Sequence, residues 1–343
     1  MSTIREVAAK AGVSVTTVSR TLNNRGYISK RTRQRIQDAM ESLNYQPNEV
    51  ARSLTFQHTR MIGVLVPEIE SPFFAGVVSR LSRLLTDRGY KMLLYIASGT
   101  DDDAPDYISM LKSNQVDGVI IALRGKSLDN ALLNRLPVVS FERLPFGEIP
   151  TVMCDNLQGG RLAAQELLDS GCVRPVMIGG RHATENIPAF ERFRGYRETV
   201  EAAGCPVRIY EIREEECQGD YTGPVREAFR QYADADGFFC SSDRIAACVL
   251  QEALRLGKRV PGDVRIVGFN DVLIPRLSAI PMTSVHQALD NMCAAAVDCL
   301  LAQINGEHYT SDLLFPVEIT RRASTRGYQS DPMTRQSHDT QRV

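Results

Sequence analysis

A chain of 343 residues with 43% hydrophobic and 24% charged residues is long enough for two or three domains with sizeable cores. No run of 18 apolar residues is present, which excludes a membrane-spanning helix. The chain also lacks a basic segment followed by an apolar one at its start, so we expect no secretory signal and a soluble, cytoplasmic protein.

The formal net charge of −1 hides an uneven distribution. Residues 1–60 hold ten Lys and Arg against four acids, a balance of +6, and the rest of the chain therefore holds 30 against 37, a balance of −7. A basic segment on an acidic body favours contact between that segment and a polyanion such as nucleic acid. A solvated basic helix face would give the same balance.

The eight cysteines are scattered and form no Cys-x-x-Cys pair. Most lie in apolar runs such as Gly237–Cys240, which indicates buried thiols in a reducing compartment rather than disulfides or a zinc site. The five histidines have no metal-ligand spacing, and no phosphate-binding glycine loop or nucleophile elbow is present. Asp101–Asp103 is better explained as a solvated loop than as a cation site. We therefore expect no metal, no cofactor, no catalytic residues and no enzymatic activity.

The first 22 residues predict two short helices joined by a tight turn. Thr3 and Glu6 have the spacing of a capping box, which starts the first helix. Gly12 permits the left-handed backbone conformation that the turn needs. Ser14 can cap a second helix over 14–22, and the whole segment then has the size of a helix-turn-helix motif.

The second helix is the candidate DNA-reading element. Val18 and Leu22 are four residues apart, so they share one face and can be buried together. The other faces carry short side chains and one long cation, a set that suits a DNA major groove. These outward residues are Val15, Thr16, Ser19 and Arg20. Taken alone, the segment also fits a small amphipathic helix that ends in an arginine.

A third helix over 30–44, capped by Ser29, completes a three-helix head with one small core, an arrangement typical of DNA-binding domains. Its inward positions are Ile36, Ala39, Met40 and Leu43, and Arg31, Arg33 and Arg35 are expected to face outward or onto a phosphate backbone. After Pro47, a segment over 49–54 is too short to be a stable helix alone. It could form a helix in the presence of a partner, either a second copy of the chain or DNA.

Residues 2–60 resemble the head of the lactose/galactose repressor family. The resemblance rests on Ile4–Arg20, Leu43–Asn48 and Ala51–Leu54, three segments with fixed spacings. It implies that Val15, Thr16 and Arg20 read bases, that Thr17 and Ser19 lie beside the DNA backbone, and that the hinge carries a minor-groove wedge. The residues expected to contact DNA are Thr3, Ser14, Val15, Thr16, Thr17, Ser19, Arg20, Asn23, Tyr45, Asn48, Ala51 and Leu54.

Leu54 is the residue that the resemblance places in the minor groove. A wedge of this kind costs about a few kcal/mol of base unstacking, which contacts on the bent DNA repay. The alternative for Leu54 is ordinary packing in a linker.

Short apolar, β-branched runs alternate with helical stretches from residue 61 onward. The expected strands are 61–66, 91–96, 116–122, 137–141, 175–178, 208–212, 237–240 and 264–269, and the expected helices are 75–88, 104–114, 127–135, 157–170, 189–203, 222–233 and 243–257. Continuous apolar strands alternating with helices predict parallel sheets covered on both faces. The number of strands favours two doubly wound subdomains, with a ligand between them at the carboxyl ends of the strands.

The body also resembles the periplasmic-binding-protein-like core of the same repressors. The matching motifs are Ser71–Phe74, Asp155–Asn156, Arg192-x-x-Gly195–Tyr196, Ser242–Asp243 and Val267–Asp271. The resemblance implies that the chain passes three times between the subdomains, near residues 157, 283 and 317. The implied fold class is an all-α helix-turn-helix head plus an α/β body of two doubly wound parallel-sheet subdomains.

The same resemblance implies an effector site. Aromatic faces can stack on a sugar ring or a base, while carboxylates, amides and arginine satisfy hydroxyl groups. The residues implied to bind effector are Phe73, Phe74, Asp155, Arg192, Tyr221 and Asn270. Each of them could instead serve packing or face solvent. Two positions depart from the family: Asn270 replaces a frequent Asp, so that the acceptor role could pass to Asp271, and Ser242 replaces a frequent Asn.

The implied domain organisation follows from these passages. It consists of a helix-turn-helix domain over 1–46, a hinge helix and linker over 47–60, an effector-binding and dimerisation domain over 61–328, and a disordered tail over 329–343. Within the large domain, the N-subdomain comprises about 61–157 and 284–316, and the C-subdomain comprises about 158–283 and 317–328. The tail carries no leucine heptads, so we expect no tetramer-forming segment there.

The sequence therefore predicts a ligand-responsive transcription regulator, a repressor of a sugar-utilisation operon. It would bind a pseudo-palindromic double-stranded operator as a homodimer and respond to a small molecule such as a sugar or sugar phosphate. Whether that effector induces or co-represses is left open. The alternative is a soluble sugar-binding or sugar-modifying protein that does not bind DNA and whose head only dimerises.

Overall fold

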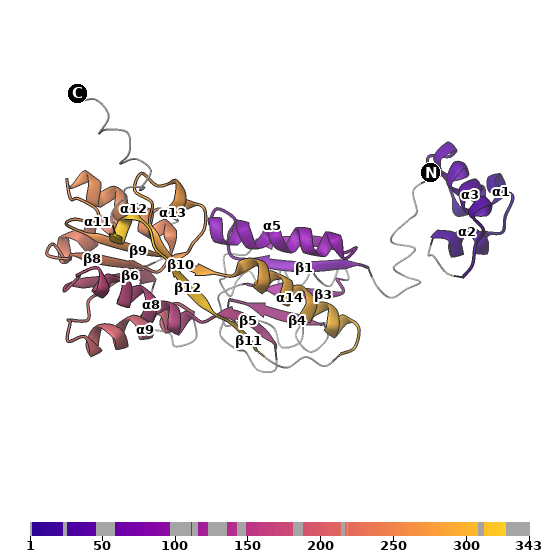
Figure 1. Ribbon diagram of the computed structural model, residues 1–343. Coiled ribbons are helices and arrows are strands. Elements are labelled where there is room, and N and C mark those ends of the chain that lie inside the picture. Colours follow the sequence, from indigo (N-terminus) through magenta and orange to yellow (C-terminus); the bar gives the residue numbers. More distant parts are fainter. Residues whose placement is uncertain are drawn as a thin grey trace, which may run out of the picture. The chain divides into compact units, whose positions relative to one another are not determined.

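The computed structural model describes residues 2–22, 26–45, 59–96, 111, 116–122, 136–142, 149–180, 188–213, 217, 219–307 and 312–326. The chain divides into two compact units, Met1–Thr59 and Arg60–Val343 (Figure 1). The predicted hinge helix, the helices expected over 104–114 (apart from Leu111) and 127–135, and the predicted tail lie outside the described residues.

The first unit contains three helices, α1 (Ile4–Ala11), α2 (Val15–Leu22) and α3 (Lys30–Ser42). The predicted capping box is present, because the Thr3 hydroxyl accepts from the Glu6 N–H and the Glu6 carboxylate accepts from the Thr3 N–H. Gly12 has the expected left-handed conformation, with φ of 63°. Local capping and one glycine therefore set the bounds of α1 and the turn after it.

One small apolar core joins the three helices. Its fully buried members are Val7, Ala8, Ala11, Val18, Ile36 and Ala39. The Ser2 hydroxyl donates to the Leu43 carbonyl at 2.7 Å and links the start of α1 to the end of α3. The head is thus closed by residues far apart in the sequence.

The second unit is built on two six-stranded sheets. The first sheet has the order β11-β5-β4-β3-β1-β2. Its strands are β1 (Met61–Val66), β2 (Lys91–Ile96), β3 (Gly118–Ile121), β4 (Val138–Phe141), β5 (Thr151–Cys154) and β11 (Leu313–Phe315). The second sheet has the order β12-β10-β9-β8-β6-β7. Its strands are β6 (Pro175–Gly180), β7 (Ile209–Ile212), β8 (Gly237–Cys240), β9 (Arg265–Asn270), β10 (Thr283–Gln287) and β12 (Val317–Thr320).

Of the described strand pairs, only β10 with β12 is antiparallel, so the predicted parallel sheets are confirmed. The helices of this unit are α5 (Pro72–Asp87), α8 (Asn156–Asp169), α9 (Pro188–Ala202), α11 (Thr222–Gln231), α12 (Asp243–Arg255), α13 (Ile274–Leu277), α14 (Leu289–Ile304) and α15 (Ala323–Arg326). The inner strands β3, β4, β5, β6 and β8 are buried throughout, as expected of parallel sheets that are covered on both faces.

The largest apolar cluster contains residues from both sheets, among them Val64, Phe239 and Phe269, together with Phe73 of α5. A second cluster lies on the other face of the second sheet, and a third lies on the other face of the first sheet. The two subdomains therefore share buried apolar surface at their junction.

The chain passes between the two sheets three times. The passages lie after β5 at Asp155, after β10 at Ala288 and between β11 and β12 at Pro316. The second one differs from the prediction, which placed residue 284 onward in the first subdomain, because β10 pairs with β9 and β12 of the second sheet.

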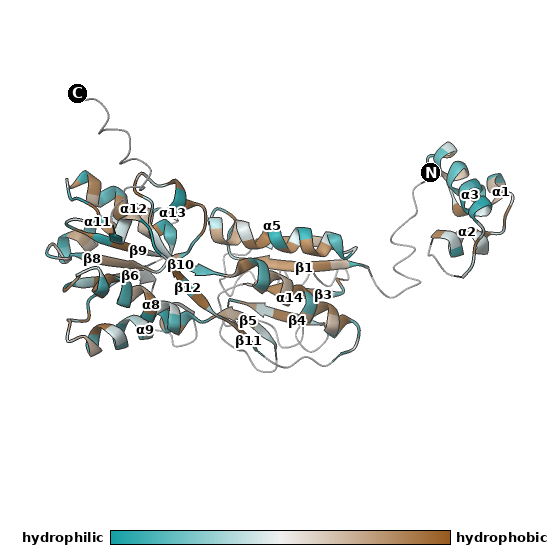
Figure 2. Ribbon diagram, viewed as in Figure 1, coloured by the Kyte–Doolittle hydropathy of each residue, from teal (hydrophilic) through white to brown (hydrophobic). Residues whose placement is uncertain are grey.

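Several elements of the structure are missing from the predicted pattern. These are β5, β10, β11, β12, α13, α14 and α15. Figure 2 shows one reason, since β1 is hydrophobic along its length whereas β10 is largely hydrophilic. Thr283, Ser284 and Gln287 of β10 are nevertheless buried. The Ser284 hydroxyl donates to Asp243 at 2.6 Å, and the Thr283 and Thr325 hydroxyls are 2.8 Å apart.

Candidate functional sites

The helix α2 exposes the side chains that were predicted to read DNA. The Ser14 hydroxyl accepts from the Thr17 N–H at 3.1 Å and caps the helix, as expected. Val18 is fully buried, whereas Val15, Thr16 and Arg20 are exposed. Helix α2 therefore presents a solvent-facing surface of two short side chains and one cation.

Two further residues of α2 depart from the simple pattern. Leu22 is only half-buried, and Thr21 is buried in its place, with its hydroxyl donating to the Thr17 carbonyl at 2.8 Å. The Arg20 guanidinium lies against Gly26, where a Cβ would stand 2.2 Å from Nη2. The lack of a side chain at Gly26 leaves room for Arg20, and Tyr27, the next residue, is 91% exposed.

The three arginines of α3 do not behave alike. All three are exposed, and the Arg35 guanidinium also donates to the carbonyl oxygens of Ala11 and Gly12 at the end of α1. These carbonyls have lost their helical partners, and a cation at a helix C-terminus satisfies them. Arg35 is exposed, as expected, but its guanidinium also binds the turn of the helix-turn-helix.

The remaining residues expected at DNA are distributed as follows. Thr3 caps α1, and Tyr45 packs partly against the core of the head. Thr17 and Ser19 are half-buried on α2. Asn23, Asn48, Ala51 and Leu54 lie outside the described residues.

In the second unit, Arg192 on α9 is the centre of the polar contacts at the junction of the two sheets. Its Nε donates to the Asn156 side chain at 2.6 Å, and its Nη1 donates to the Ser241 carbonyl at 2.8 Å. Its Cζ lies 3.7 Å from the ring centroid of Phe269, a cation–π distance. Arg192 therefore brings together the residues next to Asp155, the end of β8 and the end of β9.

A carboxylate from the first sheet lies opposite Arg192. Glu142 follows β4, and its Oε2 is 3.6 Å from Arg192 Nη2. The side chains of Arg192 and Glu142 are only 11% and 6% exposed. This partner is absent from the predicted site, although a glutamate directly after a buried strand could have indicated it.

A second ion pair also joins the two subdomains. Arg244, at the start of α12, donates to Glu68, which follows β1, at 3.1 Å. The same guanidinium lies 5.4 Å from the ring centroid of Tyr221 and donates to the Gly219 carbonyl. Tyr221 is thus brought to this ion pair rather than to Arg192.

The close packing of α8 on α9 fixes the position of Arg192. A Cβ at Gly160 would stand 2.0 Å from the Arg192 carbonyl oxygen, and a Cβ at Gly195 would stand 2.1 Å from the Leu157 carbonyl oxygen. Only glycine permits backbones to approach so closely.

Asp155, Asn270 and the two phenylalanines complete the expected set. Asp155 caps α8, since its carboxylate accepts from the Gln158 N–H at 2.8 Å. The Asn270 side-chain oxygen Oδ1 accepts from Gln287 Nε2 at 2.8 Å, and Asn270 has a φ of 104°. Phe73 and Phe74 form an edge-to-face pair and are only 7% and 9% exposed.

Asp271 cannot take the acceptor role that Asn270 leaves open. Its carboxylate is 2.6 Å from Arg322 Nη2 and 3.2 Å from the ring of His286, and it accepts from the Thr320 hydroxyl at 3.2 Å. The residue is 7% exposed and turned into the protein. Beside it, burial raises the pKa of Asp243 to about 7, against hydrogen bonds from Ser284 and Val272 that lower it.

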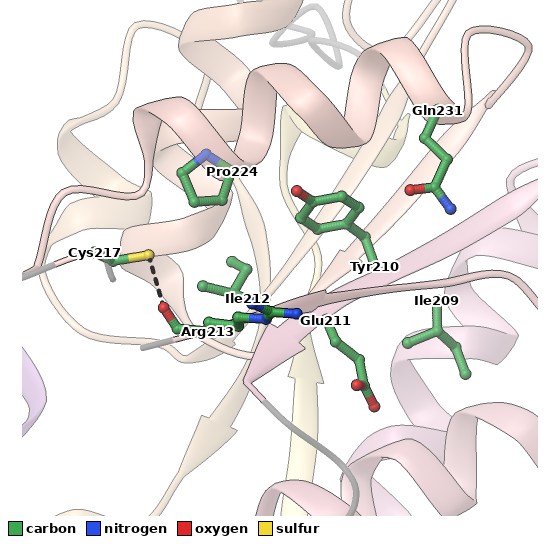
Figure 3. A pocket seen from close by; sticks show the side chains of 8 residues that line it. All are labelled: Ile209, Tyr210, Glu211, Ile212, Arg213, Cys217, Pro224 and Gln231. Carbon is green, nitrogen blue, oxygen red and sulfur yellow. Dashed lines mark hydrogen bonds between the residues drawn. The ribbon is translucent and has the colours of Figure 1, made fainter. Parts of the chain in front are cut away.

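The structure also contains a pocket of about 600 Å³ in the second subdomain, between β7 and α11. Tyr210, Arg213, Cys217 and Gln231 are among its lining residues, and the Cys217 thiol donates to the Arg213 carbonyl (Figure 3). None of the six residues expected to bind effector lines it. The concentration of buried polar groups favours the junction around Arg192 over this pocket as the effector site.

The described residues show no other kind of site. Among them, no three His, Cys, Asp or Glu side chains are arranged to hold a metal ion. No helix in the described ranges is long and apolar enough to cross a membrane. All eight cysteines are described and none forms a disulfide; six are buried and two half-buried, and burial raises the pKa of the Cys154 and Cys240 thiols.

A head with an exposed helix-turn-helix, attached to a two-sheet body with polar groups at the strand ends, defines a bacterial transcription regulator. The chain belongs to the lacI family of bacterial regulatory proteins, whose model matches residues 3–48. The model of a periplasmic binding protein-like domain matches residues 164–325. The family and the fold class expected from the sequence are therefore confirmed.

Several known proteins match this chain over nearly their whole length. The sucrose operon repressor of Pediococcus pentosaceus is 35% identical over 93% of this chain and 98% of its own. The ribose operon repressor of Bacillus subtilis is 35% identical over 95% of this chain and 99% of its own. A solved complex of the transcriptional regulator CelR with cellobiose covers 94% of this chain and 100% of its own, with 28% identity and a TM-score of 0.67.

Proposed function

We propose that the protein represses a sugar-utilisation operon and that a sugar or sugar phosphate controls its affinity for the operator. The observation that carries this proposal is the combination of exposed Val15, Thr16 and Arg20 on α2 with a buried polar cluster at the junction of two sheets. Relatives named as sucrose and ribose operon repressors support the choice of sugar. On this proposal the protein acts in the cytoplasm and is not an enzyme.

The proposed DNA-binding residues are those of the helix-turn-helix and the hinge, with α2 in the major groove and Leu54 in the minor groove. The proposed effector-binding residues remain Phe73, Phe74, Asp155, Arg192, Tyr221 and Asn270. The proposed division is a head over 1–46, a hinge over 47–60 and a binding body over 61–328. Effector binding would shift the protein between states with different operator affinity, since a ligand moves an equilibrium only by its differential affinity.

The proposed functional unit is a homodimer on a pseudo-palindromic operator. Exposed leucines on α12 and α13 support a pairing surface, because they form apolar surface that a monomer would leave in water. Leu273 and Leu277 are 61% and 73% exposed, and Leu254 and Leu256 are 44% and 45% exposed. A twofold operator matches a twofold dimer in proteins with a helix-turn-helix.

A gel-shift titration on the DNA upstream of the protein's own gene tests the proposal. We expect a shift at nanomolar protein, a steep loss of affinity with salt because phosphate contacts release counterions, and a change of affinity on adding a sugar. The control is a DNA fragment of equal length from within a coding sequence. Failure to shift any genomic fragment would favour a sugar-binding protein whose head only dimerises.

A further inference from the structure

The buried carboxylate of Glu142 is held in place by the strand beside it. Its Oε1 accepts from the Cys154 N–H at 2.6 Å, and the Glu142 N–H donates to the Val152 carbonyl at 2.8 Å. Glu142 also has a left-handed backbone conformation, with φ of 50°. These contacts aim the second carboxylate oxygen at Arg192 and leave the side chain little freedom to swing away.

The positive charge of Arg192 is therefore paired with a negative charge at the effector site. One face of its guanidinium lies on Phe269, and its donors are directed at Asn156, Ser241 and Glu142. A buried pair of opposite charges is electrically neutral as a unit, and removing either partner leaves an uncompensated charge in a low-dielectric environment. A ligand that touches Arg192 thus meets a hydrogen-bond donor whose charge is already balanced.

An anionic ligand at this position would face the Glu142 carboxylate. Two like charges close together in a buried site repel strongly, because water is not there to screen them. The hydroxyl group of an uncharged sugar can accept from a guanidinium N–H without bringing a second negative charge. The pair therefore discriminates between the two ligand classes that the proposed function leaves open.

Other described charges at the junction also disfavour an anionic ligand. Arg244 is paired with Glu68 from the opposite subdomain, just as Arg192 is paired with Glu142. Asp155 adds a carboxylate that caps α8. Among the two ion pairs and Asp155, three side chains are carboxylates and two are guanidinium groups.

We infer that Glu142 is a specificity-determining residue that makes the effector an uncharged sugar rather than a sugar phosphate. This inference rests on the proposed function, because it concerns the ligand of the same site. Glu142 acts through Arg192 and through its own charge, so it is a positioning and discriminating residue rather than a required ligand contact.

The test compares matched ligands on the full-length protein by isothermal titration calorimetry. The pairs are sucrose with sucrose 6-phosphate and ribose with ribose 5-phosphate. We expect the uncharged member of the pair that binds to bind at least tenfold more tightly than its phosphate ester. In Glu142→Gln, which keeps the size of the side chain and removes its charge, we expect this ratio to shrink at least tenfold.

Glu70→Gln is the matched control, since Glu70 is an exposed acid near the end of β1 and the substitution changes the net charge equally. It should leave the ratio unchanged. Tighter binding of the phosphate ester to the unmodified protein would overturn the inference, and so would an unchanged ratio in folded Glu142→Gln. If that variant does not fold, the comparison in the unmodified protein decides.

The two levels of the proposal fail differently. A phosphate ester that binds more tightly and alters operator affinity would reject the role of Glu142 and leave the proposed function standing. If neither member of any pair binds or changes operator affinity, the proposed sugar effector is wrong, and the inference about Glu142 falls with it.

Discussion

The head and the body of this protein place their polar side chains in opposite ways. The head buries a few small apolar residues and leaves Val15, Thr16 and Arg20 of α2 in solvent. The body buries charged groups such as Glu142 and Arg192 between two large sheets. A surface that must meet a separate polyanion stays exposed, whereas a site that must discriminate between small molecules is enclosed and electrically balanced.

Truncation of a buried side chain should have different consequences in the head and in the body. Ile36 in the head and Leu85 in the body are both fully buried. Truncating either to alanine removes about 2–5 kcal/mol of stability. That loss is close to the total free energy of unfolding of a small domain. We therefore expect Ile36→Ala to unfold the head and leave the body folded.

Scanning calorimetry with limited proteolysis measures this difference. Ile36→Ala should make the head protease-sensitive at room temperature without moving the main thermal transition. Leu85→Ala is the counterpart, and it should lower the main transition by several degrees while the head stays resistant. A protease-resistant head in Ile36→Ala would show that the head draws stability from outside its own core.

The glycine contact between α8 and α9 should be the most sensitive backbone position of the body. In Gly160→Ala, the new Cβ would collide with the Arg192 carbonyl oxygen, 2.0 Å away. We expect a loss of about 1–3 kcal/mol, as for other overpacked sites, together with weaker effector binding because Arg192 moves. Urea unfolding and calorimetric titration measure both effects.

Gly223→Ala in α11 provides the control, since no atom lies within 4 Å of its Cβ position. It should be neutral or slightly stabilising, because alanine favours the helix more than glycine does. Equal stability of the two variants would mean that α8 and α9 can separate without cost.

Removal of the exposed cation on α2 should affect DNA binding. Arg20→Ala is expected to cost about 1–3 kcal/mol of operator affinity and to relax discrimination at one operator position. Arg31→Ala removes one charge from the exposed face of α3 and should weaken binding to all sequences alike. Titrations against the operator and its single-base variants distinguish the two, and unchanged operator binding by Arg20→Ala would reject the major-groove assignment.

The buried carboxylate of Asp243 should produce a dependence of stability on pH. Burial raises its pKa to about 7 from an ordinary value of 3.8, so between these values the folded protein holds a proton that the unfolded chain releases. The contribution of Asp243 to the free energy of unfolding therefore falls as pH rises from 4 to 7, by at most about 1.4 kcal/mol per pH unit.

Urea unfolding at pH 5, 6, 7 and 8 tests this dependence in the unmodified protein and in Asp243→Asn. The free energy of unfolding of the unmodified protein minus that of the variant should fall as pH rises to 7. It should be nearly constant above pH 8, because the variant lacks the titrating group. Parallel pH profiles would show that Asp243 is already ionised at pH 5.

The sequence predicts the head in detail because its signals are local. A capping box, one glycine and two serine caps determine where the helices begin, and each acts within four residues. The role of Arg35 is an exception, since its partners lie on α1 and nothing near Arg35 in the sequence indicates them. Local rules thus define the helices of the head but not all of their mutual contacts.

The body is predictable as a class but not at its site. Apolar strands reveal the parallel sheets, whereas β10 is a polar run that is buried only because Asp243, Ser324 and Thr325 supply partners. The pairing of Glu142 with Arg192 joins residues 50 positions apart in different subdomains, and no pattern in a single sequence specifies such a contact. Resemblance to a family supplies Arg192 but not the carboxylate that balances it.

The three passages of the chain between the sheets have a consequence for biosynthesis. The edge strand β11 of the first sheet and helix α14, which packs beside β4, are made after almost all of the second sheet. Nearly the whole polypeptide must therefore be synthesised before the first sheet can be completed. Until then, the strands of this sheet that are already made have one unpaired edge. Newly made protein should depend on chaperones until residue 315 has emerged, whereas the three-helix head can fold as soon as it leaves the exit tunnel.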